Sequence, residues 1–315
     1  MRIAIAGAGG VGGLLGGLLA RSGAEVAFVA RGAHADAIRA GGLRVSSPLG
    51  TFTVRAAAVA EDPAALGPAE VVLVCVKAWQ VAELAPRLAP LLARGGVVVP
   101  FQNGVEAAGR LAAALGDARV AGGLVSVLTW IDGPGAVKHV GGAPRVKIGP
   151  RVPDQGRAIE ALAGALRAAG AEVEVVADVE RASWEKVLFI EPWGAVASVA
   201  RAPVGLVRSV PETRALLARA QEELVAVARA RGVTLPADAA AGALAVIDGV
   251  PAEATASMQR DLGAGKPSEL EDQIGAVVRL GRQAGVPVPV HEALYAALLP
   301  QELAARGSVP RFART

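Results

Sequence analysis

The sequence is poor in the residues from which disulfide frameworks and metal sites are built. Its 315 residues include one cysteine, Cys75, and three histidines, His34, His139 and His291. A single cysteine excludes an internal disulfide and a cysteine-cluster zinc site, and it is typical of a reducing compartment. The histidines lie far apart in the chain without metal-ligand spacing, so we expect no metal site.

Aromatic residues and clustered positive charge are also scarce. Aromatic side chains make up 3% of the chain, and 32 basic residues nearly balance 29 acidic ones. Because no run of Lys or Arg is present and few rings could stack on bases, nucleic-acid binding is not expected. Lysine is rare beside arginine, and a lysine can titrate where an arginine cannot. Each lysine is therefore a candidate for a site that needs an amine: Lys77, Lys138, Lys147, Lys186 and Lys266.

One long uncharged segment needs an explanation. Residues 3–20 carry no charge, which is long enough for a membrane span or a signal segment. Seven of these residues are glycine, gathered after a short β-like run, so a glycine-rich turn behind a strand explains the segment better. We expect a soluble, cytoplasmic protein that does not bind membranes.

The pattern of elements predicts two domains. Strand and helix signals alternate over residues 1–178, which indicates a mainly parallel, doubly wound Rossmann-type sheet with an antiparallel annex after residue 120. Residues 179–315 carry only helical signals. The architecture expected is an α/β domain followed by an all-α domain. The helices expected in the second domain span 179–190, 211–231, 237–246, 252–262, 269–284 and 291–299.

A glycine fingerprint follows the first expected strand and opens the first helix: Gly7, Ala8, Gly9, Gly10, Val11 and Gly12. Such a turn lets the backbone approach a pyrophosphate at a helix N-terminus, although the motif alone could be a simple turn. Arg31 ends the second strand, and residues 26–35 contain no Asp or Glu. An arginine there suits a 2′-phosphate, so NADP(H) is predicted rather than NAD(H); the alternative is an exposed loop arginine.

Polar residues also follow two later strands. Lys77 comes directly after the buried run 71–76, with Gln80 one turn on, and Gln102 and Asn103 follow the expected strand 97–100. The carboxyl ends of parallel strands form the ligand-binding edge of such sheets, although Asn103 and Gly104 could be only a turn.

Three candidates lie in the helical part. Lys186 stands in an apolar helix, where its amine either reaches the surface or loses solvation in a cleft. Ser257 and Glu269 flank a loop-like stretch, and both could equally be residues of helix starts.

In this order, the motifs resemble the ketopantoate reductase (2-dehydropantoate 2-reductase) family over nearly the whole chain. The resemblance implies NADPH-dependent reduction of a 2-oxo acid in pantothenate biosynthesis, in a cleft between the two domains. It also implies a role for each matching residue. Lys186 would be the general acid, Asn103 would orient the carbonyl or the lysine, Ser257 would contact the substrate carboxylate, Glu269 would hold lysine and substrate, and Lys77, Gln80 and Gln102 would lie along the cofactor.

One part of the resemblance fails. The family has asparagines four and eight residues after the lysine, and this sequence has Ile190 and Gly194, with Pro192 expected to break or bend the helix. Glu191 could replace one contact, but a carboxylate beside an anionic substrate would be odd. Two alternatives therefore stay open: a reductase of a different 2-oxo acid or ketone, and a non-catalytic NADP(H)-binding regulator. A homodimer is a further expectation.

Overall fold

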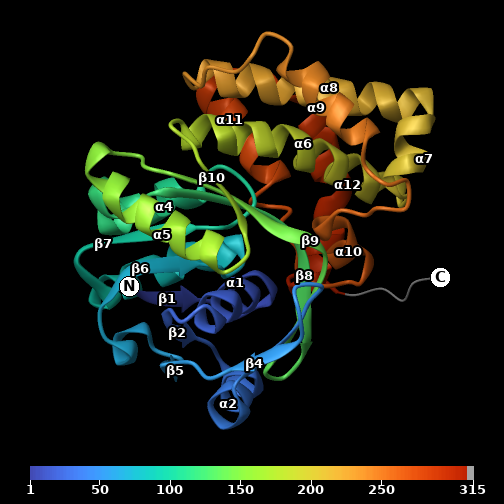
Figure 1. Ribbon diagram of the computed structural model, residues 1–315. Helices are drawn as coiled ribbons and strands as arrows, with labels where there is room; N and C mark the ends of the chain where they lie inside the picture. The colour runs from blue at the N-terminus through green and yellow to red at the C-terminus, as the bar shows by residue number, and fades with distance from the viewer. Residues whose placement is uncertain (311–315) are drawn as a thin grey trace. The chain divides into compact units, whose positions relative to one another are not determined.

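The structure is a computed structural model that describes residues 1–310 (Figure 1). The chain forms two compact units. The first contains Met1–Gln102 and Glu106–Glu180, and the second contains Asn103–Val105 with the chain from Arg181 onward. The first unit combines sheets and helices, and the second is helical. The predicted order of an α/β domain followed by an all-α domain is confirmed.

Five parallel strands form the central sheet of the first unit, in the order β5-β2-β1-β6-β7. Both faces are buried: Ile3 and Ile5 of β1 belong to one apolar core, and Ala4 and Ala6 belong to another. This is why the strands read as continuous apolar runs. Their bounds are β1 Arg2–Ala6, β2 Glu25–Val29, β5 Ala58–Ala60, β6 Ala69–Val74 and β7 Leu92–Pro100.

A second sheet has the order β10-β9-β3-β4, with β8 paired to β9. An antiparallel annex was expected only after residue 120. This is wrong in two respects, because the early hairpin β3–β4 belongs to this sheet and because β9 pairs in parallel with both β3 and β10. Strand β3 runs parallel to β9 and pairs Val45 with Val137. The bounds are β3 Leu43–Ser46, β4 Phe52–Val54, β8 Gly122–Gly133, β9 Ala136–Gly149 and β10 Glu172–Val175.

Helix α1 (Gly10–Arg21) packs between the two sheets, and its glycines make this possible. A Cβ on Gly16 would lie 2.5 Å from the Phe28 ring, and one on Gly17 would lie 2.7 Å from Val45. The uncharged segment is thus a strand and a buried helix. Within residues 1–310, no helix is both long and apolar enough to cross a membrane.

The remaining helices of the first unit are mostly short. The sequence also predicts a helix over 80–92, but this stretch forms two 3₁₀ segments around one turn of α-helix, since prolines at 86 and 90 interrupt it. The bounds are α2 Gly32–Gly41, η1 Pro63–Leu66, η2 Ala78–Gln80, α3 Val81–Leu84, η3 Ala85–Leu91, α4 Ala107–Leu115, η4 Asp117–Arg119, η5 Pro153–Gln155 and α5 Gly156–Ala168.

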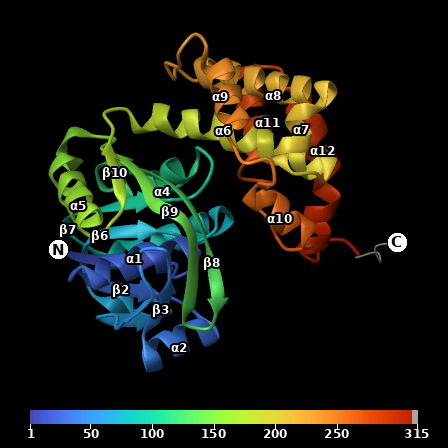
Figure 2. The same ribbon diagram turned by 45° about the vertical axis from the view of Figure 1, so that its right-hand side comes forward.

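The second unit contains the helices α6 to α12 (Figure 2). Helix α6 does not end at residue 190 as expected but continues through Pro192. Proline has no N–H for the carbonyl of Leu188, and the buried Gln221 amide of α8 donates to that oxygen at 3.4 Å. The bounds are α6 Val179–Ala200, α7 Val204–Ser209, α8 Pro211–Ala230, α9 Ala239–Asp248, α10 Ser257–Gly263, α11 Ile274–Ala284 and α12 Pro289–Ala305.

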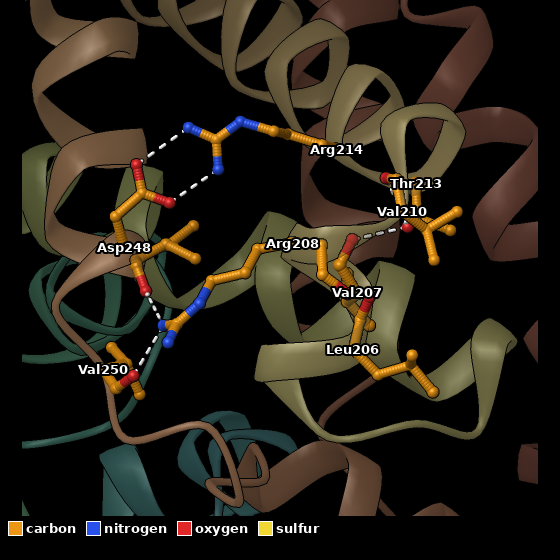
Figure 3. A network of polar contacts seen from close by, with 10 residues as sticks. Leu206, Val207, Arg208, Val210, Thr213, Arg214, Asp248 and Val250 are labelled. Atoms are coloured by element: carbon orange, nitrogen blue, oxygen red, sulfur yellow. Dashed lines mark hydrogen bonds and ion pairs between the residues drawn. The ribbon is translucent and has the colours of Figure 1, made fainter.

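A polar network ties α7, α8 and α9 together (Figure 3). Arg208 of α7 donates to the carbonyl oxygens of Ile247 and Val250 at 2.8 and 2.6 Å. Arg214 of α8 donates twice to the Asp248 carboxylate, at 2.6 and 2.8 Å. Cations at the carboxyl end of α9 match the partial negative charge of that helix end.

Candidate functional site

The glycine turn between β1 and α1 has the shape of an anion cradle. Gly7 adopts a φ of +106°, and a Cβ there would meet Val76 at 2.8 Å. A Cβ on Gly12 would collide with the carbonyl oxygen of Gly7, so this glycine lets the helix pack on the turn. In contrast, a Cβ on Gly9 would meet nothing within 4 Å. The open side of the turn therefore lies at Gly9.

The helix that follows is suited to a negative ligand. Gly9 is the N-cap of α1 without a side-chain cap, and the first turn contains no acidic residue. The partial positive charge of the helix end is thus available to an anion. Gly10 lets β8 approach, because a Cβ there would lie 2.9 Å from the Thr129 carbonyl oxygen. Together, these features fit the pyrophosphate of a dinucleotide.

His34 supports this turn, a role that no sequence motif indicates. The Gly135 N–H donates to Nδ1 of His34 at 3.1 Å, so the proton is on Nε2, which donates to the Ala8 carbonyl oxygen at 2.8 Å. The imidazole thereby joins the glycine turn to the turn between β8 and β9.

The other predicted cofactor residues lie at the carboxyl ends of the parallel strands. Arg31 is exposed at the N-cap of α2. Lys77 follows β6, and its N–H donates to Oε1 of Gln80 at 3.2 Å. Gln102 is buried behind β7 and donates to the carbonyl oxygens of Val74 and Val76 at 2.9 and 2.8 Å. The Gln102 amide nitrogen therefore joins the ends of β6 and β7.

Asn103 begins a short segment that packs with the helical unit. Gly104 has a φ of +100°, and a Cβ there would lie 2.7 Å from the Asp272 carbonyl oxygen. Only glycine permits both this conformation and this close approach. The approach brings Asn103 to the segment that carries Glu269.

Lys186, Asn103 and Glu269 form one hydrogen-bonded group. Nζ of Lys186 donates to Oδ1 of Asn103 at 3.0 Å, and Nδ2 of Asn103 donates to Oε2 of Glu269 at 3.5 Å. The Asn103 amide can satisfy both neighbours in only this orientation, because the ammonium is a donor and the carboxylate an acceptor. The structure thus brings together three residues that lie far apart in the sequence.

The environment of Lys186 makes its amine a usable acid. Burial lowers the pKa of Lys186 to about 8, and the negative charge of Glu269 opposes this effect. At neutral pH about nine in ten of these amines carry a proton. A group with a pKa this near neutrality both donates a proton readily and recovers it from solvent.

Residues absent from the predicted site hold Glu269 in place. Nε2 of Gln273 donates to Oε2 of Glu269 at 3.4 Å. Next to Glu269, the buried Ser268 donates its N–H and its hydroxyl to the Glu302 carboxylate, the latter at 2.6 Å. Gln273 is only four residues from Glu269, but Glu302 is 34 positions from Ser268, so no local motif could indicate the contact with Glu302.

Ser257 is exposed at the first position of α10. Its neighbours Ala256 and Met258 would lie 3.4 and 3.5 Å from a Cβ on Gly194. Position 194 is therefore bordered by apolar groups. Lys186, Ile190 and Gly194 are spaced four residues apart along α6, which places them on one side of the helix.

From the sequence, Glu191 was a candidate to replace one of the missing asparagine contacts. In the structure it is fully buried and belongs to a different group of side chains. Its Oε2 lies 3.1 Å from Nε2 of His291, whose Nδ1 lies 2.6 Å from Oε2 of Glu223. Burial alone would lower the pKa of His291, but the two carboxylates outweigh it and raise the pKa to about 9. A protonated His291 thus joins α6, α8 and α12. Among residues 1–310, no cluster of His, Cys, Asp and Glu side chains could hold a metal ion.

Comparison with known proteins decides the family. Residues 3–153 match the family model "Ketopantoate reductase PanE/ApbA", and residues 178–302 match its C-terminal counterpart. The chain belongs to the ketopantoate reductase family. It is 34% identical to a 2-dehydropantoate 2-reductase of Halobacterium salinarum, over 92% of this chain and 95% of that protein.

Solved structures agree. A ketopantoate reductase of the same family from Ralstonia eutropha is 35% identical, with a TM-score of 0.87 over 97% of this chain and all of that one. A reductase from Geobacter metallireducens is 32% identical, with a TM-score of 0.86 over 95% of this chain and 99% of that one. The protein is therefore an oxidoreductase that acts on CH–OH groups, and membership supports a role in pantothenate biosynthesis and a nicotinamide cofactor.

Proposed function

We propose that the protein reduces a 2-oxo acid of the ketopantoate type to the 2-hydroxy acid with NADPH, and that Lys186 is the general acid. The observation that carries this proposal is the Lys186 ammonium, which loses solvation and is held by Asn103 at 3.0 Å. A negative charge that develops on a carbonyl oxygen needs such a donor. Arginine could stabilise that charge but could not supply the proton.

The reaction needs one hydride and one proton. When bound, NADPH supplies the hydride to the carbonyl carbon, and Nζ of Lys186 donates the proton to the carbonyl oxygen. Asn103 keeps the amine in place through its Oδ1, and Glu269 stabilises the charged form of the lysine. The neutral amine then takes a proton from solvent. General acid catalysis of this kind contributes about 10²- to 10⁴-fold to the rate.

The remaining predicted residues complete the proposal. Gly7, Gly9 and Gly12 with the α1 N-terminus would hold the pyrophosphate, and the free space at Gly9 supports this role. Arg31 would pair with the 2′-phosphate. The other predicted cofactor contacts come from Ala8, Gly10, Val11, Lys77, Gln80, Gln102 and Asn103, and Ser257 would contact the substrate carboxylate.

A second candidate is a reductase of a more apolar 2-oxo acid. The observation in its favour is the apolar border of Gly194, made by Ala256 and Met258. Restoring asparagine at Ile190 and Gly194 should then raise kcat/KM for ketopantoate relative to apolar 2-oxo acids. An unchanged ratio would argue against this candidate.

The test is NADPH consumption by the purified protein with a panel of 2-oxo acids that includes ketopantoate. Turnover of ketopantoate supports the first candidate, and turnover of another member supports the second. Tight NADPH binding without turnover of any compound would favour a non-catalytic binding protein. The homodimer and the cytoplasmic location stay predictions, and sedimentation velocity would test the former.

A further inference from the structure

An acidic residue lies beside the predicted 2′-phosphate site, and it comes from another strand. Strand β5 pairs in parallel with β2, so that Val29 lies opposite Ala60 and the Ala30 N–H donates to the Ala60 carbonyl oxygen at 3.0 Å. Because parallel strands end at the same edge of a sheet, the residue after β5 meets the residues after β2. That residue is Glu61.

The Glu61 carboxylate is bound where α2 begins. Its Oε1 accepts from the Gly32 N–H at 3.0 Å. Gly32 is the first residue of α2 and directly follows Arg31, the N-cap residue. The start of α2 therefore has an arginine at its N-cap and a bound carboxylate at the next N–H.

The two groups have opposite effects on a dinucleotide. In sheets of this type, the end of the second strand recognises the 2′ position of the adenosine ribose, where a carboxylate accepts from a 2′-hydroxyl and an arginine pairs with a 2′-phosphate. A phosphate would also compete with Glu61 for the Gly32 N–H, since both are anions that seek the same donor. The repulsion between the Glu61 carboxylate and a bound 2′-phosphate would be screened less at low salt than at high salt.

We propose that Glu61 is a residue that determines cofactor specificity and opposes Arg31. It weakens the binding of NADP(H), supports that of NAD(H), and leaves the protein able to use both. This inference rests on the proposed function, because it requires that a nicotinamide dinucleotide bind at the glycine turn.

The variant Glu61→Gln tests the charge alone, because its amide oxygen can still accept from the Gly32 N–H. The dissociation constants of NADPH and NADH are measured by fluorescence titration at low and high salt. We expect NADPH to bind about tenfold more tightly and NADH no more tightly, with the NADPH gain shrinking at high salt. Arg31→Ala should change the ratio in the opposite direction.

Asp62→Asn is the matched control. It removes the same charge one residue later, but the Asp62 carboxylate accepts from the Ala64 N–H at 3.4 Å and pairs with Arg87 at 3.5 Å. This variant should leave the NADPH to NADH ratio within about twofold of wild type.

The outcomes separate the two claims. If both dinucleotides bind and Glu61→Gln leaves their ratio unchanged, or if Asp62→Asn changes it equally, the role of Glu61 is overturned while the proposed function stands. If neither dinucleotide binds to the wild-type protein, the proposed function and the role of Glu61 fail together.

Discussion

Replacing His291 with glutamine should change how the stability of the protein depends on pH. His291 is fully buried between Glu191 and Glu223, and its pKa is raised from 6.5 to about 9. A raised pKa means that the folded state binds the proton more tightly than the unfolded state. The resulting stability is fully present below pH 6.5 and is lost as the pH rises through about 9.

The size of the effect follows from this shift. One pKa unit corresponds to about 1.4 kcal/mol, so the full shift is worth about 3 kcal/mol, of which about 2 kcal/mol should disappear between pH 6 and pH 8.5. Glutamine has no proton to lose in this range. The wild-type protein should therefore lose about 2 kcal/mol more unfolding free energy over that interval than His291→Gln.

The assay is urea unfolding at a series of pH values, followed by tryptophan fluorescence. Trp184 and Trp193 are buried in the helical unit and report on it. Using the difference between the two proteins removes the titration of groups that do not contact His291, so what remains is the titration of His291 with its partners Glu191 and Glu223. Parallel pH profiles for wild type and His291→Gln would show that the imidazole is neutral in the folded protein and would refute the reasoning.

Two further predictions concern the proposed cofactor and proton sites. Gly9→Ala should leave the melting temperature unchanged but weaken NADPH binding at least about tenfold, because the added methyl group meets no protein atom within 4 Å and enters the space where we propose that the pyrophosphate binds. Gly12→Ala is its counterpart: it should lower the melting temperature, since its methyl group collides with the Gly7 carbonyl; equal melting temperatures for the two variants would contradict this assignment. Glu269→Gln should move the alkaline limb of kcat to lower pH, because the charge that raises the pKa of Lys186 is removed. Glu271→Gln, an exposed neighbour paired with Arg279, should leave that limb in place; a shift in both variants or in neither would exclude a specific role for Glu269.

Much of the fold could be predicted from the sequence, because its signals are local. The glycine turn, the strands of the central sheet and the helical second half each depend on residues that are neighbours in the chain. Strand β5 was missed because three residues carry too little pattern. The continuation of α6 was missed because the group that replaces the N–H absent at Pro192 is Gln221, on another helix.

In the candidate site, too, some residues could be predicted from the sequence and others could not. Lys186 could be singled out because a lysine is rare in this arginine-rich chain, and the family resemblance linked it to Asn103 and Glu269. The roles of Glu61 and His291 could not be predicted, since they depend on strand pairing and on helix packing between distant segments. Glu191 shows this most clearly, because its sequence position suggested the substrate and its side chain turns to His291.

The most direct test of the central claim is the pH dependence of kcat for wild type and Lys186→Ala with the best 2-oxo acid substrate. If Lys186 donates the proton, the wild-type rate falls tenfold per pH unit above about 8, and the variant is at least about a hundredfold slower and lacks this limb. A wild-type rate that stays constant to pH 9.5, or a variant with nearly normal activity, would contradict the assignment of Lys186 as the general acid.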